Sequence, residues 1–234
     1  MRARIAAGAV VALAAAAAPA HAAAPRVAQL VVFKNGAAVQ KQVTAARTTV
    51  KVGKKRCAVG EGTTLAALLK SKIGTIQVHD YGSCSSKPAD AAGLYVRRIR
   101  KDAAKGPNGW VYKVGNKVAP AGAGDPTGPF GSGLLKSGAR ITWFYCHMGA
   151  SGCQRTLAVA AKALGGGQVR VTVRAFDDRG KSRAAGGATV HVANLTAKTD
   201  SHGVATVTTS PSTRKVYAQA KGLVRSYTER IDVK

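Results

Sequence analysis

The sequence has few acidic residues and none of the common catalytic motifs. Only 10 of its 234 residues are Asp or Glu, and no spacing of paired carboxylates is present. A Gly-x-Ser-x-Gly elbow and a His-Glu-x-x-His motif are also missing. The neighbouring pairs His79-Asp80 and Cys146-His147 lie in expected strands, where adjacent side chains face opposite ways. The chain is therefore expected not to be an enzyme.

Long apolar runs are also lacking after the first residues. Residues 1–22 combine Arg2 and Arg4, an alanine-rich run over residues 5–18, and Ala20-His21-Ala22 as a small-x-small cleavage site. The run is short for a membrane span of about 20 residues, and alanine partitions weakly into lipid. Residues 1–22 are therefore predicted to be a signal peptide. The mature protein is expected to be secreted, or held at the cell envelope by non-covalent forces.

Cysteine is scarce too, with four in the chain. An even number in an exported protein favours disulfides. Three pairings are possible, and proximity in the sequence favours Cys57–Cys84 and Cys146–Cys153. A zinc site is the alternative, but no Cys-x-x-Cys pair occurs, and His147 directly follows Cys146, which is poor spacing for two ligands on one strand. The sequence thus favours two disulfides and no metal site.

Basic residues, by contrast, are abundant. Lys and Arg number 36, and the net charge is +26, or +24 once the signal peptide removes Arg2 and Arg4. Residues 23–147 carry +15 (20 basic, 5 acidic) and residues 148–234 carry +9 (14 basic, 5 acidic). Such a charge attracts anionic polymers, such as those of a cell envelope. The alternative is that the charge serves only solubility. A dedicated nucleic-acid role is not expected in an exported chain without a reading motif.

The first half predicts one helix packed on a mixed sheet. Residues 27–33 form an expected strand, Asn35-Gly36 a hairpin turn, and residues 39–52 contain the partner strand. A helix is expected within residues 60–72, because Thr63 or Thr64 can cap it and leucines follow at helical spacing. Further strands are expected at residues 76–81, 94–99, 109–114 and 141–146. This order indicates an α+β arrangement.

The second half consists of strands and turns. Expected strands cover residues 169–176, 188–195, 204–208, 215–220 and 225–233, separated by turns at residues 177–180 and 199–203. Short strands at this spacing, without a helical pattern, predict a β-sandwich. The boundary between the halves falls in residues 148–167, a linker that can include the first strand of the second half. Residues 119–133 are rich in Gly and Pro, and this long loop is a candidate for function.

The aromatic strands hold the candidate binding residues. Both tryptophans of the chain, Trp110 and Trp143, lie in these strands, with Tyr112 and Tyr145 two residues further along. On a strand, residues two apart share a face. These rings form either a packed core or a binding surface. A nearby basic run adds three candidate ligand-binding residues, or is only a solvated face: Arg97, Arg98 and Arg100.

The aromatic pattern resembles a known family. Gly109-Trp110-x-Tyr112-x-Val114, a Gly-rich loop and Leu135-x-x-Gly138-x-x-Ile141-x-Trp143-x-Tyr145 resemble the C-terminal domain of transcobalamin and its bacterial relatives. The upstream Glu61-Gly62-Thr63-Thr64-Leu65-x-x-Leu68-Leu69 resembles the start of the family's helix. The resemblance implies a β-grasp fold with one main helix over residues 26–147, of the branch that binds soluble ligands. Transcobalamin closes on cobalamin with a helical barrel, which this sequence lacks, so no cobalamin or other cofactor is expected.

The second half also resembles known domains. Ala188-Thr189-Val190 and then Thr199-Asp200-x-x-Gly203-x-Ala205-x-Val207 are similar to bacterial immunoglobulin-like and carboxypeptidase regulatory-like domains. In those domains Asp-x-x-Gly forms the hairpin turn, because Asp bonds its own backbone and Gly accepts a positive φ. The resemblance implies an immunoglobulin-like sandwich over residues 168–234, of a kind that serves as a spacer or an adhesive module.

The sequence as a whole predicts a secreted, non-catalytic binding or surface-interaction protein. We expect the first half to engage an anionic envelope polymer or a small soluble ligand. The alternatives are a structural spacer of the envelope without a small-molecule site, or an accessory subunit of a secreted enzyme. Exposed rings of Trp110 and Trp143 favour binding, and buried rings favour a spacer.

Overall fold

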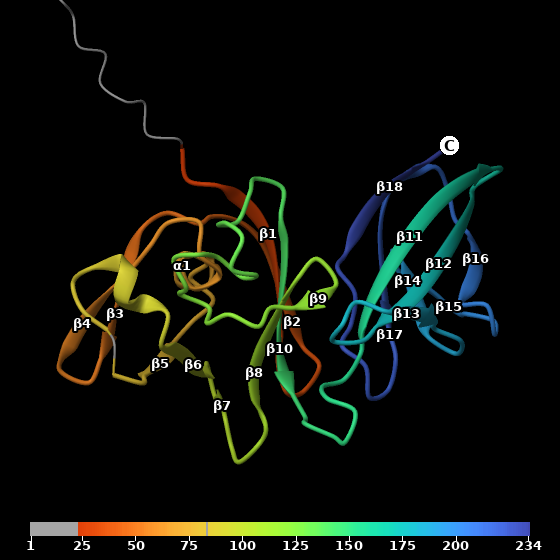
Figure 1. The fold of residues 1–234 in the computed structure, drawn as a ribbon. Coiled ribbons are helices and arrows are strands. Elements are labelled where there is room, and N and C mark those ends of the chain that lie inside the picture. The colour runs from red at the N-terminus through yellow and green to blue at the C-terminus, as the bar shows by residue number, and fades with distance from the viewer. Residues whose placement is uncertain (1–22, 83) are drawn as a thin grey trace, which may run out of the picture.

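The computed structural model describes residues 23–82 and 84–234, so the predicted signal peptide, residues 1–22, lies outside the described residues. The described chain is mostly β, with one short helix, α1 (Thr64–Lys70), and one 3₁₀ turn, η1 (Pro88–Ala91). Figure 1 shows two halves side by side, the N-terminal one in red to green and the C-terminal one in teal to blue. Within residues 23–82 and 84–234, no helix has the length and hydropathy needed to span a membrane.

The main sheet of the first half has five strands in the order β2-β1-β10-β8-β9. The first and tenth strands run parallel, and all other neighbours in this sheet are antiparallel. The predicted turn at Asn35-Gly36 is confirmed, since it joins the first two strands. The strands are β1 (Arg26–Val32), β2 (Ala38–Thr44), β8 (Gly109–Val114), β9 (Lys117–Val118) and β10 (Arg140–Cys146).

The predicted helix is confirmed and is shorter than its 13-residue window. The Thr63 side chain caps it by accepting a hydrogen bond from the Ala66 amide at 3.2 Å. Leu65 and Leu68 are fully buried in the first-half core. Two smaller sheets complete this half: β3 (Thr48–Val52) pairs with β4 (Lys55–Val59), and β5 (Ile76–Asp80) pairs with β6 (Leu94–Ile99), which pairs with β7 (Asp102–Ala103).

The second half contains two four-stranded sheets around one core. On β12 the alternating residues Val169, Val171 and Val173 are fully buried, as a strand with one covered face requires. The first strand of this half occupies half of the 148–167 segment. One sheet contains β11 (Thr156–Gly165), β12 (Gln168–Phe176), β13 (Ser182–Ala184) and β16 (Val204–Thr208). The other contains β14 (Thr189–Val192), β15 (Leu195–Lys198), β17 (Ser212–Gln219) and β18 (Glu229–Val233).

The prediction of one strand over residues 188–195 is wrong. Two strands, β14 and β15, meet there in a hairpin whose turn contains Ala193 at a φ of 53°. Both arms of the hairpin have residues suited to strands, so the apolar periodicity gives no sign of the turn between them. The last strand is also shorter than predicted, because β18 begins at Glu229 rather than at residue 225.

Both favoured disulfide pairings are confirmed. Cys57 on β4 is bonded to Cys84, which follows β5, and Cys146 at the end of β10 is bonded to Cys153. The second bond closes a short loop directly before the second half begins. Disulfides persist in oxidising compartments, so both bonds indicate an extracytoplasmic protein.

The two halves meet through a buried apolar cluster. Leu30, Val32 and Phe144 lie on the face of the main sheet away from α1, and they pack with Val224 and Tyr227 of the second half. The Tyr227 hydroxyl donates hydrogen bonds to the Ile141 carbonyl at 2.6 Å and to the Ala28 carbonyl at 3.1 Å. Both acceptors are main-chain groups of the first sheet, so Tyr227 fixes the position of one half on the other.

A buried lysine forms the second connection between the halves. Lys113, on β8, has no exposed surface, and its ammonium donates to the carbonyls of Asp177 at 2.9 Å and Phe176 at 3.1 Å. It also donates to the Thr156 hydroxyl at 3.3 Å and lies 3.6 Å from Oδ1 of Asp178. Burial lowers the pKa of Lys113, and the nearby Asp178 opposes that shift.

Candidate ligand-binding pocket

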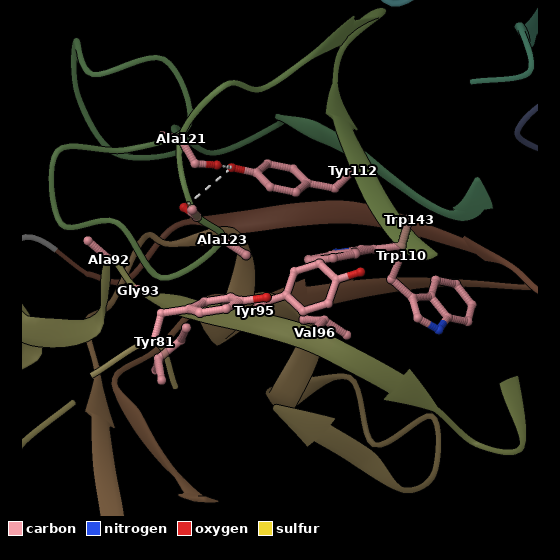
Figure 2. Close-up of a pocket in the computed structure, with 12 residues that line it drawn as sticks. Tyr81, Ala92, Gly93, Tyr95, Val96, Trp110, Tyr112, Ala121, Ala123 and Trp143 are labelled. Atoms are coloured by element: carbon pink, nitrogen blue, oxygen red, sulfur yellow. Dashed lines mark hydrogen bonds between the residues drawn. The ribbon is translucent and has the colours of Figure 1, made fainter. Parts of the chain in front are cut away.

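The first half contains an apolar pocket of about 230 Å³. It opens between β6, the 119–133 loop and the face of the main sheet that also covers α1. Figure 2 shows the rings of Tyr81 and Tyr95 lying across from Tyr112, with both tryptophans beside them. None of the described residues that line it is charged; they are Tyr81, Ala92, Gly93, Leu94, Tyr95, Val96, Trp110, Tyr112, Ala121, Gly122, Ala123 and Trp143.

The strand register brings the aromatic residues together. Trp143 on β10 lies opposite Tyr112 on β8, and Tyr145 lies opposite Trp110, so all four rings share one face of the main sheet. The ring centroids of Tyr112 and Trp143 are 5.0 Å apart, and those of Trp110 and Tyr145 are 5.9 Å apart with perpendicular planes. All four residues are buried. The rings are therefore part of the core, which by exposure alone favours the spacer alternative, but at one end they also form the wall of a pocket.

The 119–133 loop forms the opposite wall and is held from two sides. The Tyr112 hydroxyl donates to the Ala121 carbonyl at 2.8 Å. The Ala123 carbonyl accepts from the Leu65 amide at 2.8 Å and from the Thr64 hydroxyl at 2.9 Å, both at the start of α1. Burial raises the pKa of Tyr112 to about 12, so its phenol stays a donor at neutral pH. The 119–133 loop, a predicted candidate for function, thus forms one wall of the pocket and is held in place by these hydrogen bonds.

Two glycines allow the walls to approach each other closely. A Cβ at Gly109 would lie 2.2 Å from the Tyr95 hydroxyl, so glycine lets the Tyr95 ring lie against β8. A Cβ at Gly122 would lie 2.1 Å from the Ala92 carbonyl, so glycine lets the loop pack on the segment after η1. Both contacts involve the pocket lining. The size of the pocket therefore depends on these two positions as well as on the aromatic rings.

The predicted site residues divide into three groups. Trp110, Tyr112 and Trp143 line the pocket. Tyr145 lies next to it in the core, and its hydroxyl donates to the Ala103 carbonyl at 3.1 Å. The three arginines lie outside the pocket. Arg97 lines an adjoining hollow that shares Tyr81 and Tyr95 with it.

The other two arginines, Arg98 and Arg100, line neither the pocket nor the adjoining hollow. The Arg100 guanidinium lies 4.7 Å from the centre of the Phe33 ring, and its Nε donates to the Ile73 carbonyl. The Nε of Arg98 is buried and has no hydrogen-bond partner in the part of the chain that the structure describes. The structure thus brings the aromatic candidates together and places the basic run on the adjoining strand, with one of its members near the pocket.

Sequence reasoning missed Tyr81 and Tyr95. Tyr95 lies on one predicted strand and Tyr81 is the last residue of another, over residues 76–81, although the observed β5 ends at Asp80. Their ring centroids are 6.4 Å apart. Tyr81 is 73% exposed. The only signal in the sequence was that the predicted strand at residues 76–81 ends in a tyrosine and the next one, at residues 94–99, has a tyrosine near its start. Antiparallel pairing of these two strands brings that end and that start together.

Comparison of this chain with protein-family models, with curated proteins and with solved structures finds no match. Across the described ranges, no group of three or more His, Cys, Asp or Glu side chains is placed to hold a metal ion. The pocket and the positive charge are therefore the features of the protein that bear on its function.

Proposed function

We propose that this is a secreted, non-catalytic binding protein whose first half takes a small soluble ligand in the aromatic pocket. The pocket itself carries the proposal: it is apolar, walled by five aromatic side chains and held open by fixed backbone contacts. Pockets of this composition are the usual form of small-molecule sites. At about 230 Å³ it is smaller than most sites for drug-sized ligands, so it suits one or two rings or the end of a longer ligand.

The arrangement of the first half supports a β-grasp domain of the ligand-binding branch. A mixed five-stranded sheet carries α1 on one face, and the motif that resembles the transcobalamin family surrounds the pocket. For the second half we propose an immunoglobulin-like sandwich, supported by its two packed antiparallel sheets. It covers the other face of the main sheet and so serves as a support for the binding half.

Loss of one wall of the pocket tests this function. N-phenyl-1-naphthylamine is a neutral fluorescent probe, so the positive charge of the protein does not attract it. Its naphthyl end has two fused rings, the size that the pocket suits, and its phenyl ring would lie toward the opening. We expect saturable one-to-one binding, weakened about tenfold in Tyr81→Ala, because an aromatic contact contributes about 1 kcal/mol or more beyond its buried area. Fluorescence titration measures both affinities.

The matched control is Phe130→Ala. Phe130 is 42% exposed and belongs to the same 119–133 loop, but it does not line the pocket, so its replacement leaves the affinity unchanged. Binding of the neutral probe should also persist when salt rises and the Debye length falls from about 10 Å to 3 Å. Equal affinities of the two variants would contradict the proposal.

A basic cleft between the halves supports a second candidate function, adhesion to an anionic envelope polymer. The cleft has a volume of about 400 Å³ and includes Lys198, Lys221 and Arg225, with no acidic residue among its described lining. The Lys198 ammonium donates to Thr189 at 2.8 Å, and Arg225 lies 4.0 Å from the centre of the Tyr217 ring. These contacts hold two of the three cations in place.

Charge reversal in the cleft tests adhesion. We expect Lys221→Glu to weaken co-sedimentation with isolated cell envelopes about fivefold or more at low salt, since a basic residue at an anionic surface contributes about 1 kcal/mol. Lys54→Glu makes the same charge change on the exposed turn between β3 and β4 and is the control. If both variants lose the same amount, net charge alone holds the protein and the cleft has no special role.

A further inference from the structure

The indole N–H of Trp143 has no hydrogen-bond partner among the described residues. Trp143 is 1% exposed and lines the aromatic pocket, yet its Nε1 is a buried donor without an acceptor. The other tryptophan differs, because Trp110 Nε1 donates to the Asp102 carbonyl at 2.8 Å. Buried donors are nearly always paired, and leaving one unpaired is destabilising. The unpaired donor of Trp143 therefore needs an explanation, and the adjoining pocket offers one.

A second unpaired group lies on the neighbouring strand. Gln29 on β1 is 1% exposed, and within residues 23–82 and 84–234 neither its amide nitrogen nor its amide oxygen has a hydrogen-bond partner. In the register of β1 and β10, Val31 lies opposite Trp143 and Gln29 lies opposite Ile141. Gln29 is therefore a diagonal neighbour of Trp143 on the same face, a position that long side chains can reach across. Half of the buried unpaired side-chain atoms in the described residues belong to these two side chains.

We propose that the pocket selects a flat, neutral ring that carries a hydrogen-bond acceptor on its edge, such as a heteroaromatic nitrogen or a ring carbonyl. This inference rests on the proposed ligand-binding function. The acceptor takes the Trp143 Nε1–H, and the Gln29 amide adds polarity behind it. The ring is flat because Tyr95, Tyr112 and Trp143 present aromatic faces to the pocket. It is neutral because no lining residue carries a charge to pair with an ion.

Two isosteric probes separate this ligand class from simple apolar binding. Quinoline has an acceptor nitrogen in its ring, and naphthalene has the same shape without one. The chain has two tryptophans, so a nitrogen–proton correlation spectrum of the ¹⁵N-labelled protein contains two indole signals. We expect quinoline to bind about threefold to tenfold more tightly, the range of one hydrogen bond. It should also move the Trp143 indole proton downfield, whereas naphthalene should not.

Matched variants identify the donor. Trp143→Phe keeps an aromatic ring but removes the N–H, so the preference for quinoline disappears. Trp110→Phe makes the same change at the paired tryptophan and leaves the preference intact. Gln29→Met keeps a similar shape without the unpaired amide, so we expect a smaller preference for quinoline together with a higher midpoint of unfolding.

The outcomes distinguish the inference from the function beneath it. If both probes bind equally at the pocket, the acceptor preference is wrong and a water molecule satisfies Trp143, while the binding function stands. If neither probe perturbs either indole signal, both the inference and the proposed pocket function are wrong. If quinoline is preferred and the preference survives Trp143→Phe, another donor reads the ligand and the assignment to Trp143 is overturned.

Discussion

Replacement of Lys113 by Met is expected to lower the free energy of unfolding by about 2–4 kcal/mol. The variant keeps most of the aliphatic stem but loses three hydrogen bonds that join β8 to the second half. It also removes the cation next to Asp178 Oδ1, a buried oxygen that accepts no hydrogen bond from the described residues. Urea unfolding measures the change. Lys162→Met, an exposed lysine on β11, is the control and should shift stability by no more than about 0.5 kcal/mol.

The wild type and the Lys113→Met variant also give a pH test. The folded-state pKa of Lys113 lies below its ordinary value of 10.5, so between these two values the unfolded chain holds more protons than the folded one. Between the lowered pKa and 10.5, the free energy of unfolding of the wild type relative to Lys113→Met should therefore rise with pH. This gain is lost when the pH falls through the lowered pKa. Equal stability of the Lys113 and Lys162 variants at neutral pH would mean that the buried lysine does not join the halves.

Filling the pocket is expected to have the largest effect on binding. Ala123 lies between Tyr112 and the rings of Tyr81 and Tyr95 (Figure 2), so the three added carbons of Ala123→Leu occupy space that the ligand needs. We expect at least about a tenfold loss of affinity for N-phenyl-1-naphthylamine, the effect of roughly 1.4 kcal/mol. Fluorescence titration of the wild type and the variant under the same conditions measures it.

The control for this change is Ala46→Leu, between β2 and β3 and outside the pocket lining. It adds the same side chain without filling the pocket, so it should bind the probe as the wild type does. Thermal unfolding of both variants shows whether they are folded. Unchanged binding by a folded Ala123→Leu protein would place the probe elsewhere on the molecule.

Local signals in the sequence predicted much of the secondary structure. The strands at residues 94–99 and 109–114 have the predicted bounds, and Thr63 caps the predicted helix. The turn at Asn35-Gly36 also lies where it was expected. Each of these features depends on neighbouring residues, such as a cap, a two-residue turn or a run of β-branched and aromatic side chains. For this reason they can be read without knowledge of the rest of the fold.

Contacts between distant segments could not be read in the same way. Lys113 is the one charged residue of its strand and nothing near it in the sequence indicates burial, yet the second half covers it completely. Tyr227 likewise acts on main-chain groups of β1 and β10 that are far away in sequence. The hairpin at Ala193 was missed because both of its arms suit a strand. Such features depend on which surfaces meet, and a single sequence does not encode that locally.

The candidate site was predicted in part. The aromatic pattern identified Trp110, Tyr112 and Trp143, but it left open whether they form a core or a binding surface. In the structure their rings are buried and also border a pocket. Alternation along a strand indicates which face is covered, and it gives no sign of empty space next to a ring. That space depends on the close approach of Tyr95 to Gly109 and of Ala92 to Gly122.

A crystal structure of the protein soaked in N-phenyl-1-naphthylamine tests the central claim most directly. We predict density for the probe in the pocket, between Tyr95 and Ala123 and against the indole of Trp143. An empty pocket, with the probe bound only in the cleft near Arg225 or elsewhere on the surface, would contradict the account.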